Sequence, residues 1–293
     1  MKFINFGSLN IDKVYTVPHL VKEGETLSSV SYEEYPGGKG LNQSLALAKS
    51  GAKVFHAGKI GKDGLFLKQQ LALAGVNAEG IDEGGLITGH ALIQVAPTGE
   101  NCILLYGGAN KEITVEQIDQ VLEDFHADDF LVLQNETNCL EYLINAAYKK
   151  GLTIAFNPSP ISEDIKDLDF SKIDFLILNE IEGQEISGAC SPNRILNHLL
   201  SIYSNLKIVL TLGKNGVIYK DNVQEHKQEI YNVKVKDTTA AGDTFLGYFL
   251  SMISQKPDVK YALNIASKAA SLAVSRKGSS SSIPILAEVL GKD

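Results

Sequence analysis

The amino-acid sequence predicts an α/β protein: a parallel β-sheet sandwiched by helices, with a second, small β-sheet that projects from it. The first observation is that short apolar runs of strand length alternate with longer stretches of helical period. This alternation is typical of a parallel sheet whose faces are covered by helices. The second observation is a pair of strand-rich segments without helical period, residues 12–35 and 89–106. In such a protein, ligands bind beyond the carboxyl ends of the parallel strands.

The main sheet and its helices follow from the apolar pattern in chain order. Short apolar runs are expected to form buried strands at residues 2–6, 53–57, 130–134, 153–157, 174–178 and 207–211. Amphipathic helices are expected between several of these strands, at residues 41–50, 65–74, 140–149 and 192–203. The C-terminal third ends in two long helical patterns rich in Ala and Ser, at residues 242–254 and 259–277.

Residues 12–35 and 89–106 interrupt this alternation, and the second segment has two strand-like stretches around a turn at residues 97–100. Because these strands do not fit easily into the parallel sheet, we expect one small antiparallel sheet that covers the ligand site as a lid. Pairing of the lid with its copy in a second chain would bury apolar side chains that otherwise contact water. These side chains are Leu92, Val95, Ile103 and Leu105.

Length and composition are those of an ordinary globular protein. The chain has 293 residues, of which 44% are hydrophobic and 21% are charged. This length supports a single continuous core, and because no linker or internal repeat divides the chain, residues 1–293 are expected to form one domain. The net charge of −8 argues against a broad surface for nucleic acid, but it is compatible with a local basic pocket for a small anion.

Cysteine content and hydropathy indicate a protein of the reducing cytoplasm. Cys102, Cys139 and Cys190 are odd in number and far apart, which argues against a disulfide framework or a structural zinc site. No apolar run approaches the roughly 18–20 residues of a membrane span, and no signal-peptide pattern precedes the first strand-like segment. We therefore expect no membrane partner.

Several familiar nucleotide and hydrolase motifs are absent from the sequence. Gly-Lys pairs recur, but never as GxxxxGK[ST], and GxGxxG, HExxH and GxSxG do not occur. A P-loop NTPase, a dehydrogenase with the usual dinucleotide fingerprint, a zincin and a serine hydrolase therefore lose their sequence support.

The strongest local feature is the segment DTTAAGDTF at residues 237–245, directly before a helical stretch. The small residues Ala240, Ala241 and Gly242 let a ligand approach the backbone, and the free N–H groups of a helix start bind an anion. Asp243 lies in the first turn, where it can accept a proton from an attacking hydroxyl while the N–H groups hold a transferring phosphoryl group. In the alternative interpretation, Asp243 only complements the helix dipole and the small residues only allow tight packing.

Two further segments combine glycines with polar residues, the first in a turn that runs into a helix and the second at the end of a predicted strand. PGGKGLNQ at residues 36–43 has three glycines in four positions, which leave room for a substrate or a moving segment, and Asn42 projects polar atoms from the first helical turn. GSLNID at residues 7–12 follows the first predicted strand, where Asn10 and Asp12 can hydrogen-bond sugar hydroxyls. An Asx turn explains Asn10 and Asp12 nearly as well.

Several motifs, in order along nearly the whole chain, carry a family resemblance. The three long ones are GSLNID at 7–12, GGKGLNQSLALAKSGAKVFHAGKIGKDG at 37–64 and DTTAAGDTF at 237–245. The shorter ones are QNE at 134–136, NPSP at 157–160, NEIE at 179–182, TLGKNG at 211–216 and RKG at 276–278. In this order they resemble the PfkB carbohydrate kinases, and within them the ribokinase group.

The resemblance implies a ribokinase-like fold, with a doubly wound sheet, helices on both faces and a β-sheet lid that often forms the dimer interface. The implied reaction is transfer of the ATP γ-phosphoryl group to a sugar hydroxyl, with Mg²⁺ neutralising charge between the β- and γ-oxygens. By resemblance, Asp243 is the catalytic base, and Ala240, Ala241 and Gly242 form the anion hole.

The resemblance also implies which residues bind the two substrates and the ions. The sugar-binding positions are Asn10, Asp12, Gly38, Lys39, Asn42 and Glu136, together with Asp243. The ATP-binding positions are Asn179, Thr211, Gly213, Gly216, Gly242 and Ser267, and Glu182 is associated indirectly with magnesium. Ser267 departs from the pattern, because relatives usually have Asn or His there, against the adenine.

In ribokinases a monovalent cation, usually potassium, lies beside the anion hole and is held mostly by backbone carbonyls. The matching positions here are Asp237, Thr239, Ala273, Arg276, Gly278 and Ser282. In the alternative, Asp237 only caps its turn, and the side chain of Arg276 or Lys277 takes the place of the ion.

The sequence leaves several sugars as candidates for the phosphoryl acceptor. Ribose, which would give ribose 5-phosphate, leads because GGKGLNQ resembles ribokinases more than the AGGAxxN-type turn of fructokinases. The alternatives are 2-deoxyribose, a nucleoside such as pseudouridine, and a hexose such as fructose. The intact AAGD at 240–243 disfavours a non-catalytic binding protein. Kinases of hydroxymethylpyrimidine share the fold but generally lack the strand-rich lid.

Overall fold

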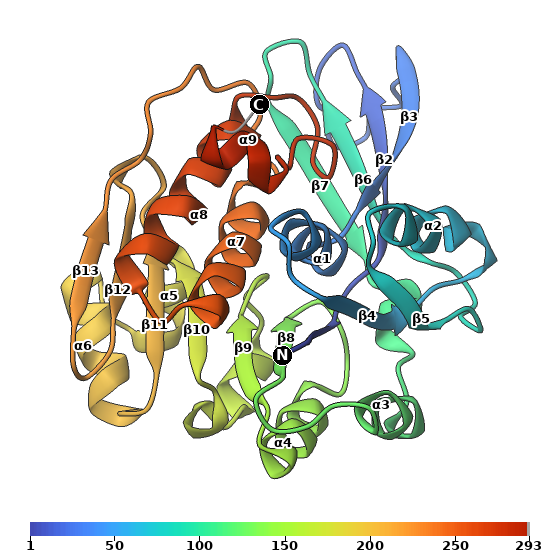
Figure 1. The fold of residues 1–293 in the computed structure, drawn as a ribbon. Helices are drawn as coiled ribbons and strands as arrows, with labels where there is room; N and C mark the ends of the chain where they lie inside the picture. The colour runs from blue at the N-terminus through green and yellow to red at the C-terminus, as the bar shows by residue number, and fades with distance from the viewer. Residues whose placement is uncertain (292–293) are drawn as a thin grey trace.

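Within residues 1–291, which the computed structural model describes, a nine-stranded sheet forms the centre of the molecule (Figure 1). Its strands are β1 (Phe3–Phe6), β4 (Val54–Lys59), β5 (Asn77–Asp82), β8 (Phe130–Gln134), β9 (Thr153–Asn157), β10 (Phe175–Asn179), β11 (Lys207–Thr211), β12 (Val217–Lys220) and β13 (Glu225–Gln228). The spatial order is β13-β12-β11-β10-β9-β8-β1-β4-β5. The strands from β11 to β5 are parallel, and β12 and β13 extend the sheet as an antiparallel edge.

The six strands predicted from apolar runs are all present, and the predicted fold class is confirmed. The strands that the pattern missed are β5, β12 and β13, which lie at the two edges of the sheet. An edge strand needs no continuous apolar run, because part of its surface faces water. The sequences of β5 (NAEGID) and β13 (EHKQ) accordingly carry several polar residues.

Helices cover both faces of the sheet. They are α1 (Lys39–Lys49), α2 (Leu65–Leu73), α3 (Val115–Leu122), α4 (Leu140–Lys150), α5 (Glu180–Ser187), α6 (Pro192–Ile202), α7 (Ala241–Gln255), α8 (Val259–Val274) and α9 (Leu286–Leu290). Short 3₁₀ helices are η1 (Lys62–Gly64), η2 (Gly108–Lys111), η3 (Glu163–Asp167), η4 (Phe170–Lys172) and η5 (Gly213–Asn215). One apolar cluster joins the sheet to α1, α2, α7, α8 and α9, and a second joins it to α3, α4 and α6.

The alternation of side chains along each strand explains the two clusters. In β8, Val132 belongs to the first cluster, whereas its neighbours Leu131 and Leu133 belong to the second. Both faces of this strand are therefore buried under helices, which is why its residues 130–133 are all apolar.

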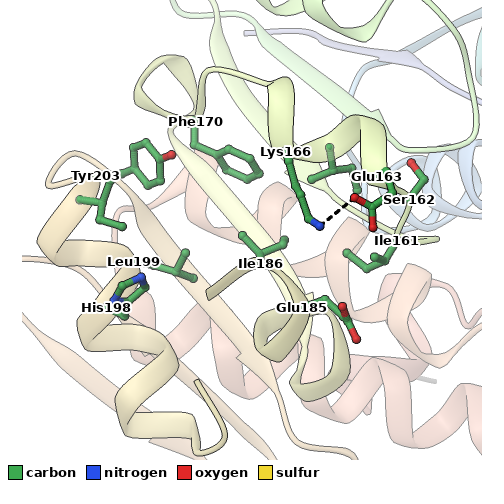
Figure 2. A pocket seen from close by; sticks show the side chains of 12 residues that line it. Ile161, Ser162, Glu163, Lys166, Phe170, Glu185, Ile186, His198, Leu199 and Tyr203 are labelled. Carbon is green, nitrogen blue, oxygen red and sulfur yellow. Dashed lines mark hydrogen bonds and ion pairs between the residues drawn. The ribbon is translucent and has the colours of Figure 1, made fainter. Parts of the chain in front are cut away.

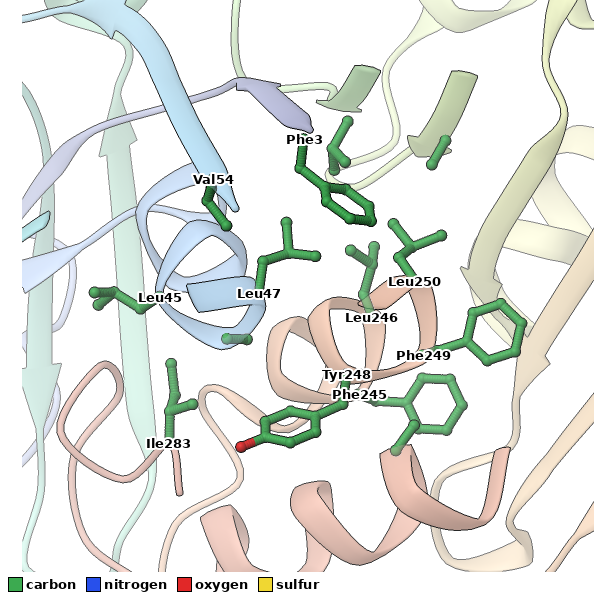
Figure 3. Close-up of a cluster of buried hydrophobic side chains, with 14 of the residues drawn as sticks. Phe3, Leu45, Leu47, Val54, Phe245, Leu246, Tyr248, Phe249, Leu250 and Ile283 are labelled. Carbon is green, nitrogen blue, oxygen red and sulfur yellow. The ribbon is translucent and has the colours of Figure 1, made fainter. Parts of the chain in front are cut away.

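Helices α1 and α7 pack closely inside the first cluster, as Figure 3 shows for Leu47 of α1 and Leu246 of α7. The closest approach is at Gly247, where an added Cβ would lie 2.5 Å from the Ala46 Cβ and 2.8 Å from the Leu47 nitrogen. A glycine is needed here because the two backbones leave no room for a side chain. This contact lies one turn after Asp243.

The last long helix ends earlier than its sequence pattern predicts. The pattern extends to residue 277, but α8 ends at Val274. Gly278 has a φ of 95°, in the left-handed region, so the chain turns away after the helix. The segment after α8 therefore returns as a loop toward the start of α7.

The two strand-rich segments form a four-stranded lid sheet in the order β3-β2-β6-β7, with β2 (Asn10–Thr16), β3 (Ser31–Gly37), β6 (Gly89–Val95) and β7 (Asn101–Tyr106). Figure 1 shows these strands projecting from the main sheet. The prediction of an antiparallel lid is wrong for its central pair, because β2 and β6 are parallel. The parallel strands β1 and β5 lead into β2 and β6, so both lid strands leave the main sheet in the same direction.

No helix in the part of the chain that the structure describes is both long enough and apolar enough to cross a membrane.

Candidate active site

Asp243 lies at the start of α7, against the first turn of α1. Only 7% of its surface is exposed. Its Oδ2 accepts a hydrogen bond from Asn42 Nδ2 at 3.2 Å, and its Oδ1 accepts one from Gln43 Nε2 at 2.9 Å. Burial raises the pKa of the Asp243 carboxyl, although the charge of Lys39 and the two side-chain hydrogen bonds oppose the rise. The group is thus a buried carboxyl with an elevated proton affinity.

Lys39 supplies a positive charge among the acidic side chains of this region. Burial acts to lower the pKa of its ammonium group, but the carboxylates of Asp243, Glu136 and Glu182 together raise it above its usual value. Lys39 therefore stays protonated among three acidic side chains that come from different parts of the chain. The structure thus brings the predicted sugar-binding, catalytic and magnesium-associated carboxylates within range of one charge.

Glu136, which follows β8, is tied to the start of α1. Its Oε2 accepts a hydrogen bond from the Lys39 backbone N–H at 3.1 Å and another from the Ser8 hydroxyl. The Ser8 oxygen in turn accepts one from the Gly40 N–H at 3.1 Å. These bonds satisfy N–H groups at the first turn of α1, which have no partner within the helix.

Glycine is required at residues 37, 38 and 40 for three different structural reasons. A Cβ at Gly37 would overlap the Asp12 carboxylate, and a Cβ at Gly40 would overlap the backbone of Gly7 and Ser8. Gly38 has a φ of 95°, which other residues rarely adopt. The glycine-rich turn therefore lets α1 start directly against the strand end that carries Ser8, and it leaves space for the Asp12 side chain.

Asn10 and Asp12 lie two residues apart on β2, so their side chains share one face of the lid sheet. Asn10 is buried, and its Oδ1 accepts a hydrogen bond from Asn110 Nδ2 at 2.8 Å. Burial, with a smaller effect from the charge of Glu136, raises the pKa of Asp12 to about 7. Asn10 is a strand residue here, so the Asx-turn alternative does not apply to it.

The predicted anion hole is at the N-terminus of α7. Within residues 1–291 the backbone N–H groups of Gly242 and Asp243 donate no hydrogen bond, whereas the Ala241 N–H donates to the Thr238 carbonyl at 3.2 Å. A Cβ at Gly242 would meet no atom within 4 Å, so the approach to these N–H groups is open. Two free N–H groups at a helix start, next to a lysine, can hold an anion.

Asp237 joins the loop before α7 to the loop after α8. Its Oδ1 accepts hydrogen bonds from the Thr239 N–H at 3.0 Å and from the Thr239 hydroxyl, and its Oδ2 accepts one from the Gly278 N–H at 3.0 Å. Arg276 pairs with Glu288 at 2.6 Å. The side chain of Arg276 is therefore engaged on α9, which contradicts the alternative in which it occupies a cation site beside Asp237.

The other predicted cation positions surround the same pair of loops. Ala273 lies in the last turn of α8, and Ser282 is buried in the returning loop. Within the described residues, the carbonyl oxygens of Thr239, Arg276 and Gly278 accept no hydrogen bond. These carbonyls and the Asp237 carboxylate form an oxygen-rich donor set, which suits a hard monovalent cation.

The predicted ATP-binding positions lie around the ends of β10 and β11 and in the middle of α8. Asn179 and Glu182 form a reciprocal N-cap of α5, in which each side chain accepts a hydrogen bond from the other residue's backbone N–H at 2.9 Å. The Thr211 hydroxyl donates to the Leu178 carbonyl at 3.3 Å. Gly213 begins η5 with open space around it, and Ser267 is buried on α8.

Glycine is required at position 216 for a structural reason that does not depend on a bound nucleotide. Its φ is 87°, and a Cβ there would overlap the Gln228 carbonyl of β13. The antiparallel pairing of β12 and β13 therefore requires glycine at this position.

Polar residues that the sequence analysis did not assign also reach the site. Asn110 of η2 accepts a hydrogen bond from the Leu9 N–H at 2.9 Å while it donates to Asn10. Gln43 contacts Asp243 directly. A signal for Gln43 is present in the sequence, because Asn42, Gln43 and Ser44 are three consecutive polar residues in the buried stretch 40–47 of α1, whose other residues are Gly, Leu and Ala.

A cavity of about 180 Å³ lies elsewhere, among η3, η4, α5 and α6 (Figure 2). Apolar side chains such as Phe170, Leu199 and Tyr203 line it, and an ion pair between Lys166 and Glu163 at 2.8 Å lies beside it. None of the predicted site residues lines this cavity. It is therefore a separate feature from the site around Asp243.

Across residues 1–291, no group of three or more His, Cys, Asp or Glu side chains is arranged to hold a metal ion.

Comparison with known proteins gives matches over nearly the whole chain. A model of the pfkB family carbohydrate kinases matches residues 2–286. The ribokinase of Staphylococcus aureus (strain COL) is 36% identical over 302 residues, covering 98% of this chain and 98% of that protein. The deoxyribokinase of Salmonella typhi is 32% identical over 293 residues, covering 95% of this chain and 94% of that protein. The crystal structure of the Thermotoga maritima ribokinase matches with a TM-score of 0.89 at 31% identity, covering 100% of this chain and 99% of that one.

Proposed function

Because the chain belongs to the pfkB family of carbohydrate kinases, we propose that it transfers the γ-phosphoryl group of ATP to ribose, giving ribose 5-phosphate and ADP. The observation that carries the proposal is the position of Asp243. It is a buried carboxylate at a helix start with free N–H groups, beside Lys39 and a cluster of polar side chains from β2, α1 and the end of β8. This combination suits proton removal from a hydroxyl next to a phosphoryl group.

Asp243 acts as the general base in the proposed reaction. Each of its oxygens accepts one hydrogen bond from an α1 side chain, which orients the carboxylate and leaves lone pairs for a substrate hydroxyl. As the ribose hydroxyl oxygen bonds to the γ-phosphorus, its proton passes to Asp243 and the bond to the β–γ bridging oxygen breaks. The pKa of Asp243, raised by burial, makes it a better proton acceptor than an exposed aspartate.

The free N–H groups of Gly242 and Asp243 hold the transferring phosphoryl group. They point from a helix start, so the backbone dipole adds to their attraction for negative charge. Ala240 and Ala241 keep the approach free of large side chains. Lys39, held protonated by the surrounding carboxylates, adds a positive charge at the same place.

The sugar is proposed to bind between the lid and the start of α1. Asn10 and Asp12 come from the lid, Gly38 and Asn42 from the α1 turn, and Glu136 from the end of β8. Carboxylates and amides placed on several sides suit a small polyol, whose hydroxyls need donors and acceptors together. The Gly37 position, which leaves room beside Asp12, supports access to that carboxylate.

ATP is proposed to lie over Asn179, Thr211, Gly213, Gly216 and Ser267, with its phosphates directed toward Gly242. A Mg²⁺ ion would accompany the phosphates and neutralise charge between the β- and γ-oxygens. Glu182 fits an indirect role in holding this ion, because it is buried and interacts with the charge of Lys39. Within residues 1–291 only one of its carboxylate oxygens accepts a hydrogen bond, which comes from the Asn179 N–H.

A potassium ion is proposed to bind between the loops that Asp237 connects. The free carbonyls of Thr239, Arg276 and Gly278, together with Asp237, Ala273 and Ser282, support this proposal. The ion would order the loop that leads into α7. The pairing of Arg276 with Glu288 also keeps the guanidinium out of this position.

A homodimer through the lid is proposed from the exposed apolar side chains of β7. Ile103, Leu104, Leu105 and Tyr106 are between 44% and 69% exposed and lie consecutively on an edge strand. An unpaired apolar edge of this kind favours association with a second copy. A reducing cytoplasmic setting is part of the proposal, because Cys102, Cys139 and Cys190 are odd in number and far apart in the sequence.

The similarity to a deoxyribokinase favours 2-deoxyribose as the second candidate acceptor. A coupled ADP-release assay with ribose, 2-deoxyribose, fructose and pseudouridine tests the proposal directly. We expect the highest kcat/KM with ribose. A higher value with any other acceptor would reassign the substrate, and release of ADP with none of them would overturn the proposed function.

A further inference from the structure

Three fully buried amide side chains form a continuous hydrogen-bonded row beneath Asp243. Asn5 of β1, Gln134 of β8 and Gln43 of α1 are each 0% exposed. Gln134 Nε2 donates to Asn5 Oδ1 at 2.9 Å and to Gln43 Oε1 at 2.8 Å. Gln43 Nε2 then donates to Asp243 Oδ1 at 2.9 Å. The row therefore joins two central strands of the sheet to the carboxylate at the start of α7.

At the end of the row farthest from Asp243, a hydrogen bond to the backbone fixes the orientation of the Asn5 amide. Asn5 Nδ2 donates to the Gly40 carbonyl at 2.8 Å and to the Ser44 hydroxyl at 2.9 Å. A backbone carbonyl only accepts hydrogen bonds, so the amide nitrogen of Asn5 must face Gly40 and its oxygen must face Gln134. The Gln134 nitrogen must then face Asn5, because the opposite orientation would place its oxygen against the Asn5 oxygen. The same nitrogen is the atom that Gln134 presents to Gln43.

This constraint decides which end of Gln43 faces Asp243. Gln43 presents its oxygen to Gln134 and its nitrogen to the carboxylate. If the amide of Gln43 turned over, nitrogen would face nitrogen at Gln134 and oxygen would face oxygen at Asp243. Only one orientation pairs every donor with an acceptor, and in that orientation a hydrogen bond supports the ionised form of Asp243.

We propose that Gln43 is a positioning residue for the reaction proposed above, because its amide holds one oxygen of the Asp243 carboxylate by a hydrogen bond. Gln134 in turn fixes the orientation of the Gln43 amide. Neither amide needs to touch the sugar or ATP for this role. The proposal rests on the proposed function only in taking Asp243 as the base.

Other charged groups also face Asp243. Lys39, at the start of α1, lowers the pKa of the Asp243 carboxyl, and Glu136, after β8, raises it. Glu182 of α5 acts on Lys39. His56 of β4 lies beyond the row, where its Nδ1 is 2.8 Å from the Ser44 hydroxyl, and burial lowers its pKa to about 3. His56 is therefore neutral near neutral pH and adds no charge to the row.

A purely structural role for the row predicts a different result from a positioning role. Loss of buried hydrogen bonds alone would lower the melting temperature and reduce turnover by the same factor at every pH. Loss of the donor to Asp243 would also raise the pKa of the base, so turnover would fall more at low pH than at high pH.

The test compares kcat against pH, at saturating ribose and ATP, for the wild type, Gln43→Leu and Gln134→Met. The control is Gln117→Met on α3, which removes a partly buried amide that donates to the carbonyls of Gly58 at 2.7 Å and Gly80 at 3.4 Å, outside the row. We expect the acid limb to move upward by about one pH unit in Gln43→Leu, by a smaller amount in Gln134→Met, and not at all in Gln117→Met.

Superimposable acid limbs in all four proteins would overturn the proposal, even if the melting temperatures fall. The same comparison is made without substrates by ¹³C NMR titration of the Asp243 carboxyl, assigned with Asp243→Asn. There, an unchanged Asp243 pKa in Gln43→Leu and Gln134→Met overturns the proposal, whereas absence of wild-type activity with any sugar overturns only the proposed function.

Discussion

Gly247 of α7 lies so close to Ala46 of α1 that a Cβ on residue 247 would come within 2.5 Å of the Ala46 Cβ. Four residues earlier on each helix, Asp243 accepts a hydrogen bond from Asn42. Because residues four apart share a helix face, the close contact at Gly247 sets the distance between Asp243 and the residues that hold it. The tight packing of two helices is thus the structural origin of the site.

Gly247→Ala is expected to push α7 away from α1. Overpacking of this kind costs about 1–3 kcal/mol, and it should also lower kcat because Asn42 and Gln43 then hold Asp243 less well. Thermal unfolding and steady-state kinetics measure the two effects. The double variant with Ala46→Gly restores part of the space, so it should recover part of both losses; no recovery would argue against this packing as the cause.

The apolar strands and the glycine motifs made much of this architecture predictable. Runs such as that of β8 are apolar because helices cover both faces, and this state leaves a clear pattern in the sequence. Edge strands such as β13 leave no such pattern. The parallel pairing of β2 with β6 depends on the direction in which two distant strands leave the main sheet, which local sequence does not encode.

The motif residues of the candidate site could be predicted from the sequence, but the residues that hold their side chains in place could not. Asp243, Asn42 and Gly38 belong to recognisable segments, whereas Asn5 and Asn110 act through contacts made by distant parts of the chain. Gly216 shows the opposite case, because its motif suggests a ligand role while the β12–β13 pairing alone already requires glycine.

Ribose binding is expected to weaken as the pH falls through about 7, the pKa of Asp12. Above this pH the carboxylate is ionised and accepts hydrogen bonds from the sugar, and below it the group is protonated, so the ribose KM should rise by up to about tenfold per pH unit. Kinetics at several pH values measure this. A KM that does not vary with pH would show that Asp12 does not bind the sugar as a carboxylate.

The same pKa shift has an opposite effect on stability. Since the Asp12 pKa is higher in the folded protein than its usual value of 3.8, ionisation disfavours the folded state, and this cost develops as the pH rises from about 4 to about 7. Asp12→Asn should therefore raise the melting temperature at about pH 8 while it weakens ribose binding. An equal change in melting temperature at about pH 4 would contradict this origin.

Potassium is expected to raise turnover more than sugar affinity. An ion between the loops joined by Asp237 and Gly278 would order the segment that leads into Gly242 without touching the sugar. Assays in potassium, sodium and Tris buffers measure the effect, and Asp237→Asn should reduce it. Equal turnover in all three buffers would contradict a potassium site.

Replacing apolar lid residues with charges is expected to give monomers. Ile103→Glu and Leu105→Glu place carboxylates on the exposed strand β7, and Val223→Glu is the control, since Val223 is 91% exposed on a turn outside the lid. Light scattering at micromolar concentration should show a dimer for the wild type and the control and a monomer for the lid variants. A monomeric wild type would remove the dimer from the proposal.

The most direct test of Asp243 as the base is Asp243→Asn, which keeps the shape of the side chain and removes the proton acceptor. Turnover with ribose and ATP is measured together with ribose affinity by calorimetry. The protein should fold and bind ribose as the wild type does, while kcat falls by about 10²–10⁴-fold, the usual contribution of a general base. Turnover close to that of the wild type would contradict the assignment of Asp243 as the group that takes the proton.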